Sequence, residues 1–281
     1  MASTYINHLK DYYQRVEDFP QRRNVLTIGD SWFQYPLRLY PDLQTRLSSD
    51  AKLGKRCNIL DDSVPGRDAK DVPARIRLWS DIAAHLQGLG HPFAAILLSL
   101  GGNDVIGRDF PQHLRDGVGS SQASWPWHPN VPALVRRWLD LAALKQTFER
   151  IVASYQMIVA MRDAYAPGAT IVTHTYASVT PMNRPYKFAG LRAGPWIWKY
   201  AHRAGVPDAD QKILVDWLLE SFANRMKAFG AASTDPARFV VLDTRRELPD
   251  PAAWDNEIHP LGPGFIHLAD DIWFPLLDPL L

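Results

Sequence analysis

The chain contains five short apolar runs, at residues 25–28, 57–60, 93–100, 170–175 and 239–243. Two of them, "AAILLSL" and "FVVLD", are continuously apolar, as expected of strands that are covered on both faces. Segments with helical periodicity separate the runs. Strands that alternate with helices indicate βαβ units, a parallel sheet and an α/β fold. Five such strands, with helices on both faces of the sheet, favour a flavodoxin-like order.

Three segments are predicted to be helices because their apolar residues recur every three or four positions. Residues 1–22 form an N-terminal amphipathic helix in this interpretation. The two longer segments are "LKQTFERIVASYQMIVAMRDAY" and "ILVDWLLESFANRMKAF". In each segment these residues would form a stripe along one face of the helix. The N-terminal stripe is Ile6, Leu9, Tyr13, Val16 and Phe19. The stripe of the second segment is Phe148, Ile151, Tyr155, Ile158 and Arg162, and that of the third is Val215, Leu218, Phe222, Met226 and Phe229.

Two long segments, at about residues 107–132 and 178–208, interrupt the alternation of strands and helices. Each follows a predicted strand end, so both are expected over the same edge of the sheet, where long insertions often form lids or binding loops. Their tryptophans either line an apolar or sugar-binding cleft or pack the loops onto the body: Trp125, Trp127, Trp196 and Trp198. A second domain is not required, and residues 1–281 are predicted to form one domain.

Composition excludes several classes of protein. Thirty-one basic and thirty acidic residues leave a net charge of +1, so no strong field favours nucleic acid or an anionic membrane. Cys57 is the only cysteine, which rules out an intrachain disulfide. The charged N-terminus does not resemble a signal peptide, and no apolar run approaches the roughly 20 residues that span a bilayer. We expect a soluble, cytoplasmic protein, with secretion by a signal-independent route left open, as is the oligomeric state.

Four residues with groups that could take part in catalysis follow predicted strands or lie near the C-terminus. They are Ser31 in "IGDSW", Gly66 in "PGRD", Asn103 in "LGGND" and His259 in "NEIHP". Because parallel strands end at one edge of a sheet, these residues are expected to face one another.

Together they match what acyl transfer requires. A serine hydroxyl is a weak nucleophile that needs a base within hydrogen-bond reach, and histidine suits that role near neutral pH. The negative oxygen of the tetrahedral intermediate needs fixed hydrogen-bond donors. Backbone N–H groups and an asparagine amide are donors of this kind.

These four motifs, in this order, resemble blocks I, II, III and V of the SGNH (GDSL) hydrolases. The resemblance covers the chain from about residue 25 to its end. It implies a three-layer α/β/α fold and ester hydrolysis through an acyl-enzyme, without a metal or other cofactor. The tryptophan-rich insertions would allow a lipid ester or an acetylated-carbohydrate ester as the substrate. It also implies that Ser31 is the nucleophile, that His259 is the base, and that the oxyanion donors are Ser31, Gly66 and Asn103.

The chain departs from the family at one catalytic position. The family usually has an aspartate three residues before the histidine, whereas this chain has Asn256, preceded by Asp255. Asn256 could accept the ring N–H through its carbonyl oxygen, and it would stabilise the imidazolium less than a carboxylate does. Asp255 could act in its place if the turn shifts by one residue, and Asp243 is a third candidate. A non-catalytic binding module on the same scaffold is therefore the alternative function.

Four further residues are candidates for substrate binding: Trp32, Asp104, Trp196 and Trp198. Asp104 has an alternative role in supporting its loop. His174 and His267 are interpreted as structural residues. His259 and His267 lie eight residues apart without a matching carboxylate pattern, so no metal site is expected there.

Overall fold

The computed structural model describes residues 5–6, 8–35, 41–188 and 191–281. Its central sheet has six strands in the order β1-β3-β2-β4-β5-β8, and neighbouring strands run parallel. The strands are β1 (Tyr5–Ile6), β2 (Arg23–Gly29), β3 (Cys57–Asp61), β4 (Phe93–Ser99), β5 (Thr170–His174) and β8 (Phe239–Leu242). The five predicted apolar runs correspond to β2, β3, β4, β5 and β8. The order of these five is the flavodoxin-like one, in which the first predicted strand, β2, lies between the second, β3, and the third, β4.

The N-terminal segment differs from its prediction. Helix α1 (Leu9–Asp18) is shorter than the helix expected over residues 1–22, and Ile6 lies in β1 rather than on the helix. β1 pairs with β3, with Tyr5 opposite Ile59. This added strand covers the backbone N–H and C=O groups that β3 would otherwise expose at the edge of the sheet. Residues 1–4 and 7 lie outside the described part of the chain.

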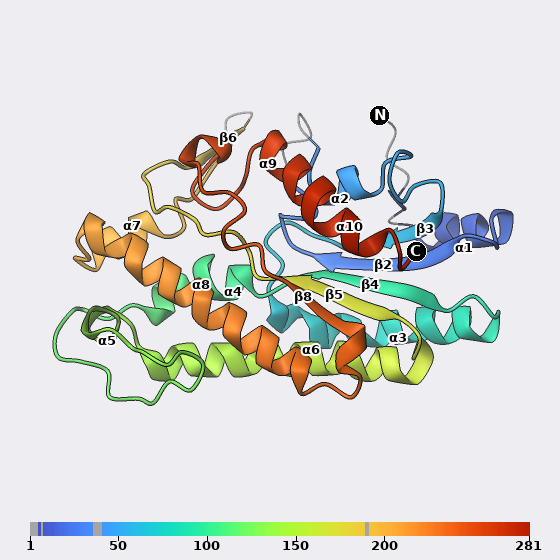
Figure 1. Cartoon of the computed structure of the whole chain (residues 1–281). Helices are drawn as coiled ribbons and strands as arrows, with labels where there is room; N and C mark the ends of the chain where they lie inside the picture. The colour runs from blue at the N-terminus through green and yellow to red at the C-terminus, as the bar shows by residue number, and fades with distance from the viewer. Residues whose placement is uncertain (1–4, 7, 36–40, 189–190) are drawn as a thin grey trace.

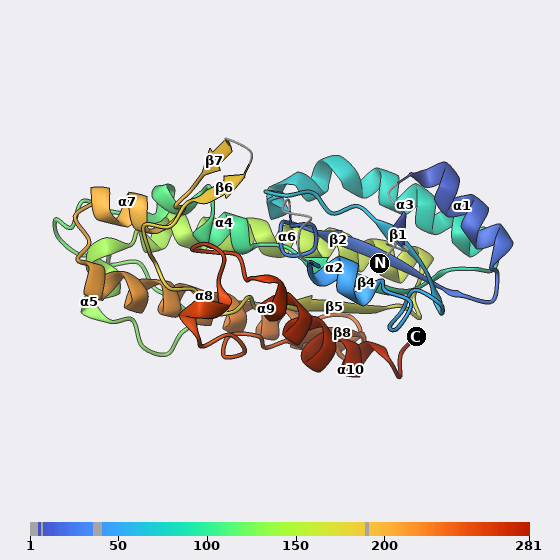
Figure 2. The same ribbon diagram turned by 90° about the horizontal axis from the view of Figure 1, so that it is seen from above.

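Helices cover both faces of the sheet, as Figures 1 and 2 show. One layer contains α3 (Val72–Gly88), α6 (Leu141–Tyr165) and α8 (Asp208–Ala231). The opposite layer contains α2 (Leu43–Leu47), α9 (Gly262–His267), the π-helical turn η5 (Leu268–Trp273) and α10 (Phe274–Leu277). The predicted three-layer α/β/α fold is therefore confirmed.

The two long helices bury the stripes that their periodicity predicted. All ten stripe residues of α6 and α8 are buried, including the charged Arg162. The Arg162 guanidinium is paired with Asp163 and donates to the carbonyl oxygens of Ala169 and Arg238, each at 3.3 Å. A buried charge is tolerated here because these contacts replace part of its water shell.

The two insertions and α4 (Gly102–Ile106) lie toward the end of the sheet where the strands finish, at the left of Figure 1. The other elements on these segments are η2 (Phe110–His113), the hairpin of β6 (Tyr186–Phe188) and β7 (Leu191–Ala193), and α7 (Trp198–Arg203). The rest of the chain adds η1 (Ala69–Asp71), α5 (Ala133–Trp138), η3 (Pro236–Arg238), which directly precedes β8, and η4 (Pro251–Ala253). No helix in the described ranges is both long and apolar enough to cross a membrane.

Candidate active site

The turn that carries Ser31 begins where β2 ends. The Asp30 N–H continues the ladder by donating to the Ser99 carbonyl at 3.0 Å, and the Asp30 carboxylate then accepts from the Trp32 N–H at 2.9 Å. The same carboxylate accepts from the Ser99 hydroxyl at 2.8 Å and the Tyr176 hydroxyl at 2.6 Å. Burial raises the pKa of Asp30 to about 6, while these bonds act in the opposite direction. Asp30 therefore holds the turn, and Ser31 is left to project from it.

Ser31 and His259 meet although 228 positions separate them in the chain. The Nε2 atom of His259 lies 2.7 Å from the Ser31 Oγ atom, and both side chains are buried. Burial lowers the pKa of His259 to about 3, so the imidazole is neutral at neutral pH. A neutral imidazole can accept the hydroxyl proton at the nitrogen that faces the serine.

Asn256 selects which nitrogen carries the histidine proton. Its Oδ1 atom accepts from the backbone N–H groups of Ile258 and His259, both at 3.1 Å, which fixes the orientation of the amide. The same oxygen lies 2.9 Å from His259 Nδ1. Because a carbonyl oxygen only accepts, Nδ1 must carry the proton and Nε2 is left to face Ser31.

Asp255 stands one step further from the histidine. The Nδ2 atom of Asn256 donates to Asp255 Oδ2 and to the Tyr35 hydroxyl oxygen, both at 3.1 Å. The Tyr35 hydroxyl in turn donates to Asp255 Oδ2 at 2.5 Å. The Tyr35 ring also packs against the His259 ring, with centroids 4.8 Å apart. Of the three orienting residues considered from the sequence, Asn256 makes the direct contact and Asp255 braces it.

Asp243, the third candidate, is engaged elsewhere. Its carboxylate pairs with Lys227 at 2.6 Å and with Arg245 at 2.7 Å. These contacts lower the pKa of Asp243 below its ordinary value, with the Arg245 hydrogen bond as the largest cause.

Asn103 lies in the first turn of α4, directly after two glycines. Gly101 has a φ of 103°, in the region that favours glycine, and a Cβ atom on Gly102 would come within 2.6 Å of the Tyr176 ring. One N–H of the Asn103 amide donates to the Arg67 carbonyl at 3.1 Å. A primary amide has two N–H donors, so the second can serve another acceptor.

Gly66, the remaining predicted oxyanion donor, lies next to Arg67 and so adjoins the backbone group that Asn103 contacts. It is exposed, has a φ of 76°, and faces open space where a side chain would stand. It does not line the cavity that Ser31 and Asn103 share. Its role as a donor stays a prediction.

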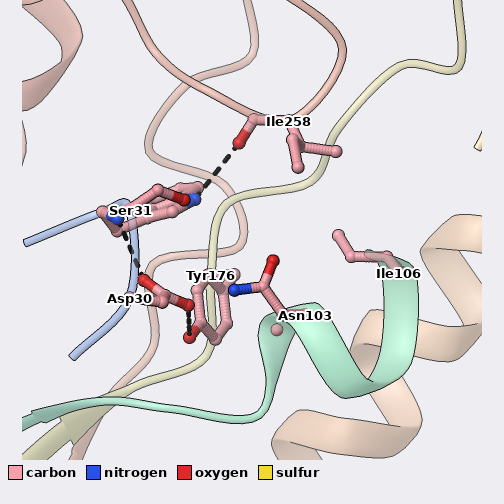
Figure 3. Close-up of a pocket in the computed structure, with 8 residues that line it drawn as sticks. Asp30, Ser31, Asn103, Ile106, Tyr176 and Ile258 are labelled. Atoms are coloured by element: carbon pink, nitrogen blue, oxygen red, sulfur yellow. Dashed lines mark hydrogen bonds between the residues drawn. The ribbon is translucent and has the colours of Figure 1, made fainter. Parts of the chain in front are cut away.

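A small cavity adjoins the Ser31 side chain, and Figure 3 shows the residues around it. Asn103 and Ile106 reach it from α4, and Ile258 reaches it from the loop that carries His259. Tyr176 lines the same cavity. Residues from four separate stretches of the chain therefore converge on one point.

The predicted substrate-binding residues are divided between the site and its surroundings. Trp32 lines the cavity, and its indole N–H donates to the Ile258 carbonyl at 3.1 Å. Trp196 packs edge-on against the His259 ring, at a centroid distance of 5.5 Å. Asp104 is buried beneath the site, where it accepts from the Ala69 N–H at 2.7 Å, and burial raises its pKa to about 7. That contact is the loop support considered as its alternative role.

The other tryptophans of the insertions are packing residues. Trp198 stacks on His202 within α7, with centroids 4.7 Å apart. Trp125 is buried and donates to the Ser221 hydroxyl of α8 at 3.0 Å. Trp127 stacks on Phe148 of α6. The segment at 107–132 thus attaches to the helical layer through Trp125 and Trp127. For these two tryptophans the structure agrees with the interpretation that they pack the loop onto the body.

Comparison with known proteins adds evidence on the fold. No protein-family model matches the sequence, and no curated protein matches it. Among solved structures, a lipase from a goat rumen metagenome shares 10% sequence identity over 92% of this chain and 97% of that one, with a TM-score of 0.52. The chain has the fold of this lipase. The fold implied by the resemblance to the SGNH hydrolases is therefore confirmed.

Two further solved structures score lower. A member of the lipolytic protein G-D-S-L family from Veillonella parvula has 11% identity, covers 88% of this chain and 94% of that one, and gives a TM-score of 0.46. An acetyl esterase has 14% identity, covers 92% of this chain and 98% of that one, and gives a TM-score of 0.49.

On this lipase-like fold, the structure adds a residue that sequence reasoning missed. Glu257 is buried, and its carboxylate accepts from the backbone N–H groups of Met182 at 3.2 Å, Ile197 at 2.7 Å and Trp198 at 2.5 Å. Burial raises its pKa, and the three hydrogen bonds oppose that shift. Glu257 therefore ties the insertion at 178–208 to the loop of His259. The only signal in the sequence is an acidic residue within "NEIHP", beside the histidine.

Tyr35 and Tyr176 were also missed. Each hydroxyl reaches a carboxylate that is distant in the sequence, Asp255 and Asp30 respectively. Tyr176 further adopts a φ of 60°, which is unusual for a residue other than glycine. No local pattern in the sequence marks either tyrosine.

Proposed function

We propose that the protein hydrolyses carboxylic esters through an acyl-enzyme on Ser31. The observation that carries the proposal is the contact of 2.7 Å between Ser31 Oγ and His259 Nε2, with Asn256 on the opposite ring nitrogen. A nucleophile, a base and a group that orients the base are the parts that nucleophilic catalysis by serine requires.

In the acylation step, Ser31 Oγ attacks the ester carbonyl while its proton passes to His259 Nε2. The carbonyl oxygen becomes an oxyanion, for which the Ser31 N–H and the free N–H of the Asn103 amide are donors, with the Gly66 N–H as a predicted third. The intermediate collapses by breaking the bond to the alcohol oxygen. That oxygen takes the proton from His259 and leaves as an alcohol.

Deacylation repeats the sequence with water. His259 takes a proton from a water molecule while the oxygen of that water attacks the acyl carbonyl. The bond to Ser31 Oγ then breaks, Ser31 recovers a proton from His259, and the carboxylic acid leaves. Asn256 holds the imidazole in one tautomer throughout, and the imidazolium that forms in each step lacks a directly bonded carboxylate.

A fluorophosphonate probe tests the proposal against the alternative of a binding module. We expect the probe to label Ser31 and to abolish hydrolysis of p-nitrophenyl acetate. Ser31→Ala and His259→Ala should each remove the activity without changing the circular dichroism spectrum. Ser120→Ala, at an exposed position in the segment at 107–132, is the matched serine control. Full activity in folded Ser31→Ala protein would refute the assignment, and a wild-type protein that neither reacts with the probe nor hydrolyses esters would support a binding module.

A further inference from the structure

The cavity beside Ser31 is too small for a long acyl chain. Its volume, measured for the centre of a water-sized sphere, is about 10 Å³. A single water molecule requires about 10–15 Å³ on the same measure. The space next to the nucleophile therefore holds a group about the size of one water molecule or one methyl group.

Two isoleucines form the apolar walls of this cavity. Ile106 lies on α4, three residues after Asn103, and Ile258 directly precedes His259. Both side chains are buried. Figure 3 shows Ile106 on α4 and Ile258 on the loop above it. An acyl chain that enters this cavity from Ser31 would meet these walls.

The two aromatic residues that line the floor of the cavity, Tyr176 and Trp32, are held in place by hydrogen bonds. The Tyr176 hydroxyl donates to the Asp30 carboxylate at 2.6 Å. The Tyr176 ring also packs closely on Gly102, where an added Cβ atom would lie 2.6 Å from the ring. The Trp32 indole, which also lines the cavity, is held at the Ile258 carbonyl. Movement of either ring would break a buried hydrogen bond, which costs free energy.

We propose that the site takes esters of acetic acid and excludes longer acyl groups, and that Ile106 sets this limit. The proposal rests on the ester hydrolysis proposed above and specifies its substrate class. It concerns the acyl side of the ester only. One additional methylene that does not fit an apolar pocket changes selectivity by about 10- to 200-fold.

A series of p-nitrophenyl esters with one leaving group tests the limit. For the wild-type protein, kcat/KM should fall by about 10-fold or more from acetate to butyrate, and octanoate should not be hydrolysed. Ile106→Ala should raise the butyrate-to-acetate ratio by about 10-fold or more, because it removes three carbon atoms from the wall. Ile213→Ala on α8, where 49% of the side chain is exposed, is the control and should leave the ratio unchanged.

The outcomes separate this proposal from the proposed function. Wild-type protein that hydrolyses octanoate as well as acetate overturns the size limit and leaves ester hydrolysis standing. Wild-type protein that hydrolyses no ester and resists the fluorophosphonate probe overturns the proposed function itself. If Ile106→Ala does not fold, Ile106→Val makes the smaller change, and an unaltered butyrate-to-acetate ratio in that folded variant overturns the role of Ile106.

Discussion

The position of the carboxylate near His259 should decide how activity depends on pH. In this chain a neutral amide contacts the imidazole, and the carboxylate of Asp255 lies behind it. Burial without a directly bonded countercharge keeps the pKa of His259 at about 3. The base therefore stays unprotonated as the pH falls through 6.5, where an ordinary imidazole would be half protonated. We expect kcat/KM for ester hydrolysis to persist well below pH 6.

Exchanging the two residues, by Asp255→Asn together with Asn256→Asp, moves the carboxylate onto the ring nitrogen without changing net charge. Two unit charges about 4 Å apart interact by about 4 kcal/mol at an effective dielectric constant of about 20. At about 1.4 kcal/mol per pKa unit, the pKa of His259 should rise by about three, to about 6. Because a protonated histidine cannot act as the base, activity at low pH should be lost.

The exchange should also raise kcat near pH 8, because the carboxylate stabilises the imidazolium that forms in the transition state. The geometry accommodates the change, since Tyr35 can donate its hydroxyl hydrogen to a carboxylate at either position. Asn256→Asp alone is less suitable, because it sets two carboxylates about 3.1 Å apart, where like charges disfavour ionisation of both.

The assay is kcat/KM for phenyl acetate from pH 4 to pH 9, with released phenol measured by chromatography. This quantity reports the ionisations of the free enzyme. Comparing variants isolates His259 from other groups, such as Asp30 with its pKa raised to about 6. Asp255→Asn alone is the control. In this variant the pH at which kcat/KM falls on the acid side should not rise above that of the wild-type protein. An acid limb at the same pH in the exchanged and wild-type proteins would contradict the role given to the Asn256 contact.

Three other substitutions test the supporting structure. Asn103→Ala should lower kcat about 100-fold with a smaller change in KM, and undiminished turnover would count against its role as an oxyanion donor. Glu257→Ala leaves three backbone N–H groups without their acceptor. The free energy of unfolding in urea should therefore fall by at least about 1–3 kcal/mol, and proteolysis within residues 183–196 should accelerate. If neither value changes, the contacts of Glu257 with the insertion are dispensable. Gly102→Ala should cost about 1–3 kcal/mol of stability, because its methyl group overlaps the Tyr176 ring, and a neutral effect would show that the floor of the cavity yields.

Much of the site could be predicted from sequence because of one geometric rule. Parallel strands end at one edge of a sheet, so motifs that follow different strands come together there even when the chain between them is long. Ser31 after β2 and Asn103 after β4 are placed in this way. His259 follows β8 by a longer connection, and its approach to Ser31 was expected from the order of the motifs.

Local pattern alone determined the α/β class, the five main strands and the buried faces of α6 and α8, because hydrophobic periodicity reports which side of an element is covered. Tertiary structure decided the sixth strand, the choice of Asn256 over Asp255 as the partner of His259, and the clamp at Glu257. It also decided the size of the cavity at Ile106. These features depend on contacts between side chains and backbone groups that lie far apart in the chain, and the spacing of residues within one segment carries no information about such contacts.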